Sequence, residues 1–267
     1  MNCAAMKTAR GTAPVPRPNA GLARYDWWLV IALALVLKQA YSLADAAHLQ
    51  WILQPLAWLL EHTAGFSWQR LESGEWLDAG RRIVLVKGCA GGHFMILSWL
   101  AWLWRAGSGP GRAKLLHPAT LAAAFAAAWA TALAVNALRI VILFHFEGDL
   151  ARLTALSAAD SHRLLGIALY YPALWAQLAF KATRPGAAFR AAALYLGFVL
   201  LLPALHAVLL GRPPLPAAYV WWTAGVPLGL AGLTLLRPTF WKFRNRAARP
   251  QAAGLRPPGR HWRLPRR

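Results

Sequence analysis

The chain has 267 residues, of which 58% are hydrophobic and 14% are charged, and its formal net charge is +20. A soluble domain of this length could not bury so much apolar surface, and the apolar residues occur in long runs. The composition therefore predicts an integral membrane protein. Ten of the 29 Lys and Arg residues fall in the final segment 237–267. Because this basic segment is rich in Pro, Gly and Ala, we expect it to contact membrane lipid and no nucleic acid.

The first 61 residues predict a leader, one membrane span and one surface helix. Residues 1–24 lack a long apolar region and are expected to form a flexible, basic cytoplasmic leader. Trp27 to Leu43 is the first predicted span, and Lys38 falls inside it. Either its ammonium reaches the outer interface or it faces a polar cavity. Residues 45–61 are too short and too polar for a span, which favours an interfacial or re-entrant helix.

A polar stretch then leads to a glycine-rich segment around Cys89. Residues 65–87 are rich in charged side chains, so we expect an aqueous loop or hairpin there. The sequence Gly88-Cys-Ala-Gly-Gly92 follows and precedes an apolar run typical of a membrane helix. Cys89 is therefore expected at or just before a helix N-terminus, where backbone N–H groups favour an anion. The alternative for Cys89 alone is a small buried thiol without a function.

Five further spans are predicted, at Gly92–Trp104, Ala119–Leu138, His162–Phe180, Ala191–Leu210 and Tyr219–Leu236. A basic turn is expected at 105–117. The apolar run 119–146 has about 28 residues, which as a helix exceeds a hydrocarbon core about 30 Å thick. We therefore expect a break, a tilt or an emergence from the membrane near Arg139. The acidic segment 147–161 predicts an aqueous loop, and residues 237–267 predict a basic, disordered cytoplasmic tail.

The expected fold is an all-α polytopic membrane helix bundle. It has about six transmembrane helices, an interfacial or re-entrant segment and a short exoplasmic loop, with one membrane domain over residues 25–236. Lys and Arg are retained on the cytoplasmic side of membranes. With the N-terminus inside, the cytoplasmic segments hold 20 of the 29 Lys and Arg residues. This orientation predicts that both termini are cytoplasmic and that Cys89, Arg139 and His162 lie near the exoplasmic face.

These three side chains are together sufficient for acyl transfer. The thiolate of Cys89 would be the nucleophile, favoured by cationic neighbours and a helix N-terminus. His162 could accept the thiol proton and then protonate the departing amine. Arg139 could hydrogen-bond the oxyanion or hold the carbonyl of the substrate.

Two other histidines are alternative candidates for the base. His93 is a rival base because it lies one helical turn from Cys89, and His145 is a weaker third candidate that is expected at the membrane interface. The sequence has no HExxH motif and no paired-cysteine spacing, so we expect no metal. Nothing resembles a nucleotide-binding loop, and no cofactor is expected.

Three short motifs resemble those of the exosortase/archaeosortase transpeptidases, over roughly residues 30–182. The family pattern has a Cys followed by a small residue and Gly before a membrane helix, then Asn-x-x-Arg-Ile, then a His with Gly four residues later. The sequence has, in this order, Cys89-Ala-Gly91, Asn136-Ala-Leu-Arg139-Ile140 and His162-Arg-Leu-Leu-Gly166. The resemblance implies that Cys89 is the nucleophile and that Arg139 and His162 are its catalytic partners.

The same resemblance implies supporting roles for Asn136, Gly91 and Gly166, and a catalytic core at 30–182. It implies a thiol protease or transpeptidase that cleaves near the C-terminal sorting signal of secreted proteins. That signal is a short motif, a transmembrane helix and a basic cluster, and the acceptor would be an unidentified group of the cell envelope. The implied location is the bacterial cytoplasmic (inner) membrane, with the site on the periplasmic face.

Two functions of other classes stay open at the level of sequence. A transporter or channel could line a polar path with Lys38, Arg139 and His162, although the chain has no internal repeat and no matching pair of broken helices. A non-catalytic assembly factor could use the basic tail to dock on lipid or on a partner.

Overall fold

A computed structural model gives the fold and describes residues 22–108, 115–154, 158–179, 184–211, 213 and 215–247. The predicted leader lies outside these residues except for 22–24, which form the start of the first helix. Residues 248–267 of the predicted tail and the middle of the basic turn, 109–114, also lie outside them.

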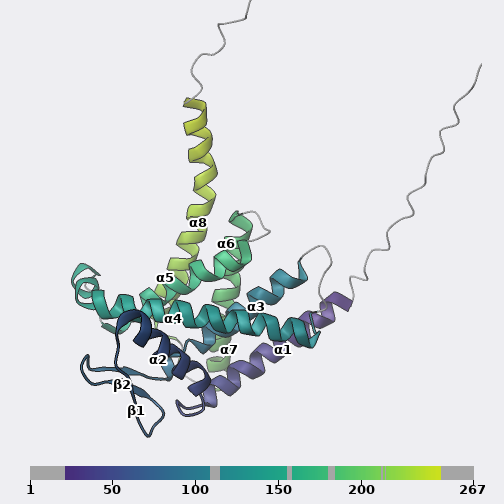
Figure 1. The fold of residues 1–267 in the computed structure, drawn as a ribbon. Helices are drawn as coiled ribbons and strands as arrows, with labels where there is room; N and C mark the ends of the chain where they lie inside the picture. The colour runs from purple at the N-terminus through teal and green to yellow at the C-terminus, as the bar shows by residue number, and fades with distance from the viewer. Residues whose placement is uncertain are drawn as a thin grey trace, which may run out of the picture.

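Most of the described chain is helical (Figure 1). The helical elements are α1 (Leu22–Leu43), α2 (Gln50–Ala64), the 3₁₀ turn η1 (Lys87–Cys89), α3 (Gly92–Gly107), α4 (Pro118–Thr154), α5 (Ala158–Leu178), α6 (Arg184–Leu196), the π-helical segment η3 (Gly197–Leu201), α7 (Leu202–Leu209) and α8 (Ala217–Ala247). The strands are β1 (Gln69–Arg70), β2 (Trp76–Asp78) and β3 (Ile83–Leu85), which pair antiparallel in the order β1-β2-β3. The all-α prediction is thus corrected by one small sheet, within the segment where a loop or hairpin was expected.

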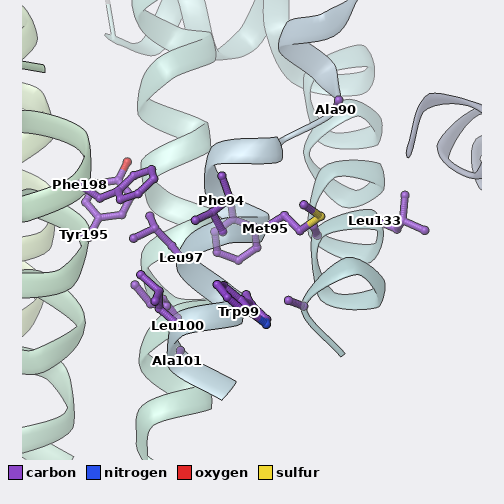
Figure 2. Packing of buried hydrophobic residues seen from close by; sticks show 14 of the residues in the cluster. Ala90, Phe94, Met95, Leu97, Trp99, Leu100, Ala101, Leu133, Tyr195 and Phe198 are labelled. Atoms are coloured by element: carbon purple, nitrogen blue, oxygen red, sulfur yellow. The ribbon is translucent and has the colours of Figure 1, made fainter. Parts of the chain in front are cut away.

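Helix α3 forms the centre of the fold and packs against α1, α4 and α5. It is apolar on every side, which is the pattern of a helix surrounded by other helices. Figure 2 shows its side chains between two neighbours, with Tyr195 and Phe198 on one side and Leu133 of α4 on the other. Phe94 and Leu97 are almost fully buried in this core. The residues at the start of α3, which follow Cys89 directly, are therefore held firmly in place.

Six helical units correspond to the six predicted spans: α1, α3, α4, α5, the continuous α6–η3–α7 unit and α8. Among the described residues, three segments are long and apolar enough to cross a membrane, at Asp26–Leu43, Pro118–Phe146 and Gly186–Leu209. Helix α3 has 16 residues and is about 24 Å long, shorter than a typical hydrocarbon core. The length and apolar character of these helices thus support a multi-pass membrane protein. The number of six spans remains a prediction.

Helix α4 differs from the prediction at two places. It runs without interruption through Arg139, where a break was one of the expected outcomes. It then continues to Thr154, so most of the segment 147–161 is helical and the expected aqueous loop there is wrong. Helix α5 begins at Ala158, which leaves only 155–157 between the two helices, outside the described residues. Since α4 has 37 residues and is about 55 Å long, the expected tilt or emergence from the membrane remains a prediction.

Helix α2 has the amphipathic character expected of a surface helix. Its apolar face, including Leu53 and Leu56, is fully buried, and the helix packs along α4 beside the sheet (Figure 1). Trp51 and Trp58 are exposed on the other side, as in aromatic residues at a membrane interface. With 15 residues the helix is too short to cross a membrane, and its interfacial or re-entrant placement remains a prediction.

The small sheet is fixed to the helices by a buried carboxylate and an arginine. Asp78 accepts hydrogen bonds from the backbone N–H of Ser67 (2.9 Å) and of Arg81 (3.0 Å). Burial alone would raise the pKa of Asp78, but these N–H donors and the Arg81 charge lower it overall. The Arg81 guanidinium lies 4.3 Å from the ring centre of Phe66 and 5.0 Å from that of Phe144 on α4. The sheet therefore has a defined position beside α4 near Phe144.

The C-terminal third contains the π-helical segment and the longest helix after α4. A π-helical segment inserts an extra residue into a turn and is frequent at functional sites. Here η3 joins α6 to α7 and carries Phe198 and Val199, which both line one cavity. Helix α8 continues to Ala247 and projects beyond the other helices (Figure 1). The first part of the predicted disordered tail, 237–247, is thus helical.

Candidate active site

Cys89 ends a tight turn that is tied to the end of α1. Val86 is extended, and the N–H of Cys89 then donates to the Val86 carbonyl at 2.8 Å, which closes the 3₁₀ turn. The Lys87 ammonium donates to the carbonyls of Ser42 (2.8 Å) and Ala44 (2.6 Å), which would otherwise be unpaired at the C-terminus of α1. Cys89 is half-buried, so its thiol is held at a fixed place and is still accessible.

Gly91 allows the chain to pass from this turn into α3 against α4. Its φ is +64°, a left-handed conformation that glycine adopts without strain. A Cβ at Gly91 would overlap the side-chain amide of Asn136, so the two residues are in direct contact. The amide of Asn136 also donates to the carbonyl of Ala132 at 2.8 Å, which fixes its orientation. These contacts give a physical reason for Gly91 and Asn136 as supporting residues.

Three separate segments of the chain come together at one cavity of ≈ 380 Å³. Cys89 from the turn, Arg139 from α4 and His162 from α5 all line it, and Gly166 lies on the same wall as His162, one helical turn later. The structure thus places the three predicted catalytic side chains around a common space. Within the described residues, no hydrogen bond joins Cys89 to His162, so proton transfer requires a further approach of the two, as is frequent before substrate binds.

Arg139 is a buried cation in a polar network between α4 and α5. Only 6% of its surface is exposed. Its terminal nitrogen Nη1 donates to the Tyr170 hydroxyl, and that hydroxyl donates to Oδ1 of Asn136 at 2.6 Å. The Nε of Arg139 is buried without a partner among the described residues. Because this Nε is shielded from solvent, a substrate oxygen would have to contact the part of the guanidinium that lines the cavity.

His162 lies in the first turns of α5 and is exposed towards the cavity. Its imidazole is close enough to Arg139 for the two to interact electrostatically. Helix periodicity places His162, Gly166 and Tyr170 on one face, since they are four residues apart. A Cβ atom at Gly166 would lie 3.6 Å from Arg139 and 3.6 Å from Tyr170, which are ordinary contact distances. Glycine at this position therefore leaves room for the guanidinium.

The rival histidines lie elsewhere. His93, in the first turn of α3, lines a neighbouring groove and packs edge-on against the rings of Tyr41 and Phe198. His145 is exposed near the end of α4 and contacts Phe144 and Phe146. Neither of them lines the cavity around Cys89. The geometry favours His162 over both as the base.

Tyrosines are the residues that sequence reasoning missed. Tyr170, Tyr195 and Tyr219 line the cavity, from α5, α6 and α8. The ring of Tyr170 is stacked on that of Phe94, with 4.6 Å between the ring centres. Its position four residues after Gly166 could have identified Tyr170, because the two share a helix face with His162. Tyr195 and Tyr219 come from helices outside the three motifs, and no signal in the sequence pointed to them.

This arrangement contains the groups that acyl transfer needs and no evident place for a metal. Within the described ranges, no group of three His, Cys, Asp or Glu side chains lies close enough to hold a metal ion.

Comparisons of the chain with protein-family models, with curated proteins and with solved structures gave no match. The assignment of a function therefore depends on the motif residues and on the cavity that they line.

Proposed function

We propose that this protein is a membrane-embedded cysteine protease or transpeptidase of the exosortase/archaeosortase type. The observation that carries the proposal is the common cavity of Cys89, Arg139 and His162. These residues come from three separate motifs, and a chance grouping would not be expected to combine a nucleophile, a base and an oxyanion donor. The proposed substrate is a secreted protein whose C-terminal sorting signal has a motif, a transmembrane helix and a basic cluster.

The proposed reaction begins with attack of the Cys89 sulfur on the carbonyl carbon of the scissile peptide bond. His162 takes the thiol proton and passes it to the amine that leaves when the C–N bond breaks. A thioester between Cys89 and the N-terminal part of the substrate remains. An amine or hydroxyl of the envelope, or water, then breaks this C–S bond and restores the thiol.

We assign to Arg139 the role of hydrogen-bonding the negatively charged oxygen that forms at the substrate carbonyl during both steps. Its place on the cavity wall and its buried position suit this role, since a donor is strongest where water is excluded. The network through Tyr170 to Asn136 holds the guanidinium plane at a fixed angle. Arg139 is then catalytic, while Tyr170 and Asn136 are positioning residues.

We further propose that α1, α3, α4, α5, the α6–η3–α7 unit and α8 all cross the bacterial inner membrane. Both termini are then cytoplasmic, and the cavity opens near the periplasmic face. Support comes from the basic segments, which this orientation places in the cytoplasm. The polar sheet before Cys89 would lie on the periplasmic side.

The proposal is tested by expressing this protein together with secreted proteins that carry a candidate C-terminal sorting signal. Such substrates are sought among the proteins encoded by neighbouring genes. The wild type should remove the C-terminal helix of a true substrate, detected as a smaller mature form. Cys89→Ala should abolish this change, and Cys3→Ala, the matched variant at the other cysteine, should leave it intact. Equal processing by the Cys89→Ala variant would exclude the thiol mechanism.

A further inference from the structure

A second cavity lies next to the site and has a different chemical character. It has a volume of ≈ 340 Å³ and shares Tyr170, Tyr195, Val199 and Tyr219 with the cavity of Cys89. Its other side is formed by Lys38 and Ser42 of α1, by His93, Phe94 and Leu97 of α3, and by Phe198 and Pro203. We call this space the Lys38 groove.

The Lys38 groove carries positive charge without a counter-charge. Among the described residues, the Lys38 ammonium makes no hydrogen bond or ion pair, and it lies 6.0 Å from the centre of the Phe198 ring. The charge of Lys38 acts on His93, and no Asp or Glu lines the described wall. A lone cation in an apolar helix is costly, so a ligand that neutralises it would be bound favourably.

The position of the groove suggests where such an anion comes from. Lys38 lies five residues before the end of α1, about 7.5 Å along the helix axis, which is the depth of the headgroup boundary. Leu35, one turn before Lys38, and Leu201 of η3 are exposed apolar residues. Phe198 and Leu97 form an apolar floor. The groove thus combines a cationic end with an apolar floor.

We propose that the Lys38 groove binds a phospholipid, with its phosphate at Lys38 and His93 and an acyl chain along Phe198 and Leu97. A phosphate is the anion that is abundant at this depth in a membrane, and both side chains donate to it. An apolar substrate helix would gain nothing from the uncompensated charge, and a free phosphate would not use the apolar floor. The proposal concerns binding only and does not depend on the proposed catalytic function.

The test uses the full-length protein in detergent and native mass spectrometry with added dioleoyl phosphatidylglycerol or dioleoylglycerol. The wild type should retain phosphatidylglycerol, and dioleoylglycerol should bind at least about tenfold more weakly because it lacks the phosphate. Lys38→Gln and His93→Gln should each weaken phosphatidylglycerol binding, together by about tenfold or more. Arg70→Gln, which removes an equal charge from the exposed sheet, should leave binding unchanged.

Two further arms separate a binding defect from misfolding and from other occupants. Lys38→Arg keeps the charge and should restore most of the binding, whereas a fold defect at this position would affect both variants. Glycerol phosphate should compete only weakly, because it lacks acyl chains. Equal binding of the two lipids, an equal loss in Arg70→Gln, strong competition by glycerol phosphate, or displacement only by a substrate peptide would each overturn the proposal.

Discussion

The hydroxyl of Tyr170 donates a hydrogen bond to Oδ1 of Asn136 at 2.6 Å and accepts one from the Arg139 guanidinium. One phenol thus links two residues of the Asn-x-x-Arg motif on α4 to the helix that carries His162. The amide of the same Asn136 lies against Gly91, two residues after Cys89. The three motifs are therefore parts of one contact network.

Tyr170→Phe should separate positioning from folding. The ring remains stacked on Phe94, but two hydrogen bonds are lost, one of them to a charged group, so the free energy of unfolding should fall by about 2–4 kcal/mol. Substrate processing should fall by about tenfold or more, because Arg139 loses its fixed orientation. Two measurements check this prediction: the rate of substrate processing, and a thermal unfolding curve of the purified protein in detergent.

Tyr171→Phe is the matched control for that variant. Tyr171 is fully buried and donates to the carbonyl of Ala188 at 3.0 Å, but it does not line the cavity. Loss of this single hydrogen bond should lower the free energy of unfolding by about 1 kcal/mol and leave processing unchanged. Equal losses of processing in both variants would show that the effect of Tyr170→Phe is a general one on stability.

Gly91→Ala should damage the site more than Gly166→Ala. At Gly91 the new methyl group would overlap Asn136, and the positive φ adds roughly 1–2 kcal/mol of backbone strain. At Gly166 the methyl group would meet Arg139 and Tyr170 only at 3.6 Å, an ordinary contact. The free energy of unfolding of each variant checks this order, and Asn136→Ala should partly rescue Gly91→Ala. Equal stability of the two variants would contradict the packing described here.

Arg139→Lys should reduce processing by roughly one to three orders of magnitude. Lysine keeps the charge but lacks the planar set of donors that contacts both Tyr170 and an oxyanion. The reaction of Cys89 with a small alkylating agent should change little, because that reaction forms no oxyanion. If alkylation fell as much as processing, Arg139 would be acting on the thiol and not on the carbonyl.

His162→Ala and His93→Ala should differ in their effect on the thiol. His162 lines the cavity of Cys89 and His93 lines the Lys38 groove, so only His162→Ala is expected to slow alkylation of Cys89. The measurement is the alkylation rate as a function of pH for both variants. Slower alkylation in His93→Ala alone would move the base assignment to His93.

The sheet should lose stability in acid because of Asp78. Its pKa is lowered in the folded state by the N–H donors of Ser67 and Arg81, so its contribution to stability is present above its unfolded pKa of about 3.9. That contribution is lost as the pH falls through the lower, folded pKa. Limited proteolysis of 66–85 between pH 6 and pH 2.5 should show acid-induced opening. Asp78→Asn should be cut more readily at pH 6 and should lose most of this pH dependence.

The sequence predicted helices and motif residues better than it predicted their ends. Periodicity and apolar runs identified the helical units, and the short length of α2 was recognised because it falls below that of a span. The acidic segment 147–161 suggested water, but α4 continues through its first half, which contains no proline and only one glycine, Gly148, before Thr154. Charge indicates exposure to water and does not by itself end a helix.

The candidate site could be predicted only as far as local motifs reach. Cys89, Arg139 and His162 are each marked by neighbours in the sequence, and the structure places them on one cavity. Tyr195 and Tyr219 reach this cavity from helices outside the motifs, through long-range packing that no short pattern records. The position of Lys38 was left open, and the structure places it on the wall of a groove.

The central claim is that Cys89 forms a thioester with its substrate, and the most direct measurement is the intact mass of the protein. The full-length protein would be purified after brief co-expression with a tailed substrate and analysed before and after treatment with hydroxylamine, which cleaves thioesters. The account predicts an adduct on Cys89 that contains the N-terminal part of the substrate, that hydroxylamine removes, and that is absent in Cys89→Ala. Continued processing without such an adduct, or processing by Cys89→Ala, would contradict it.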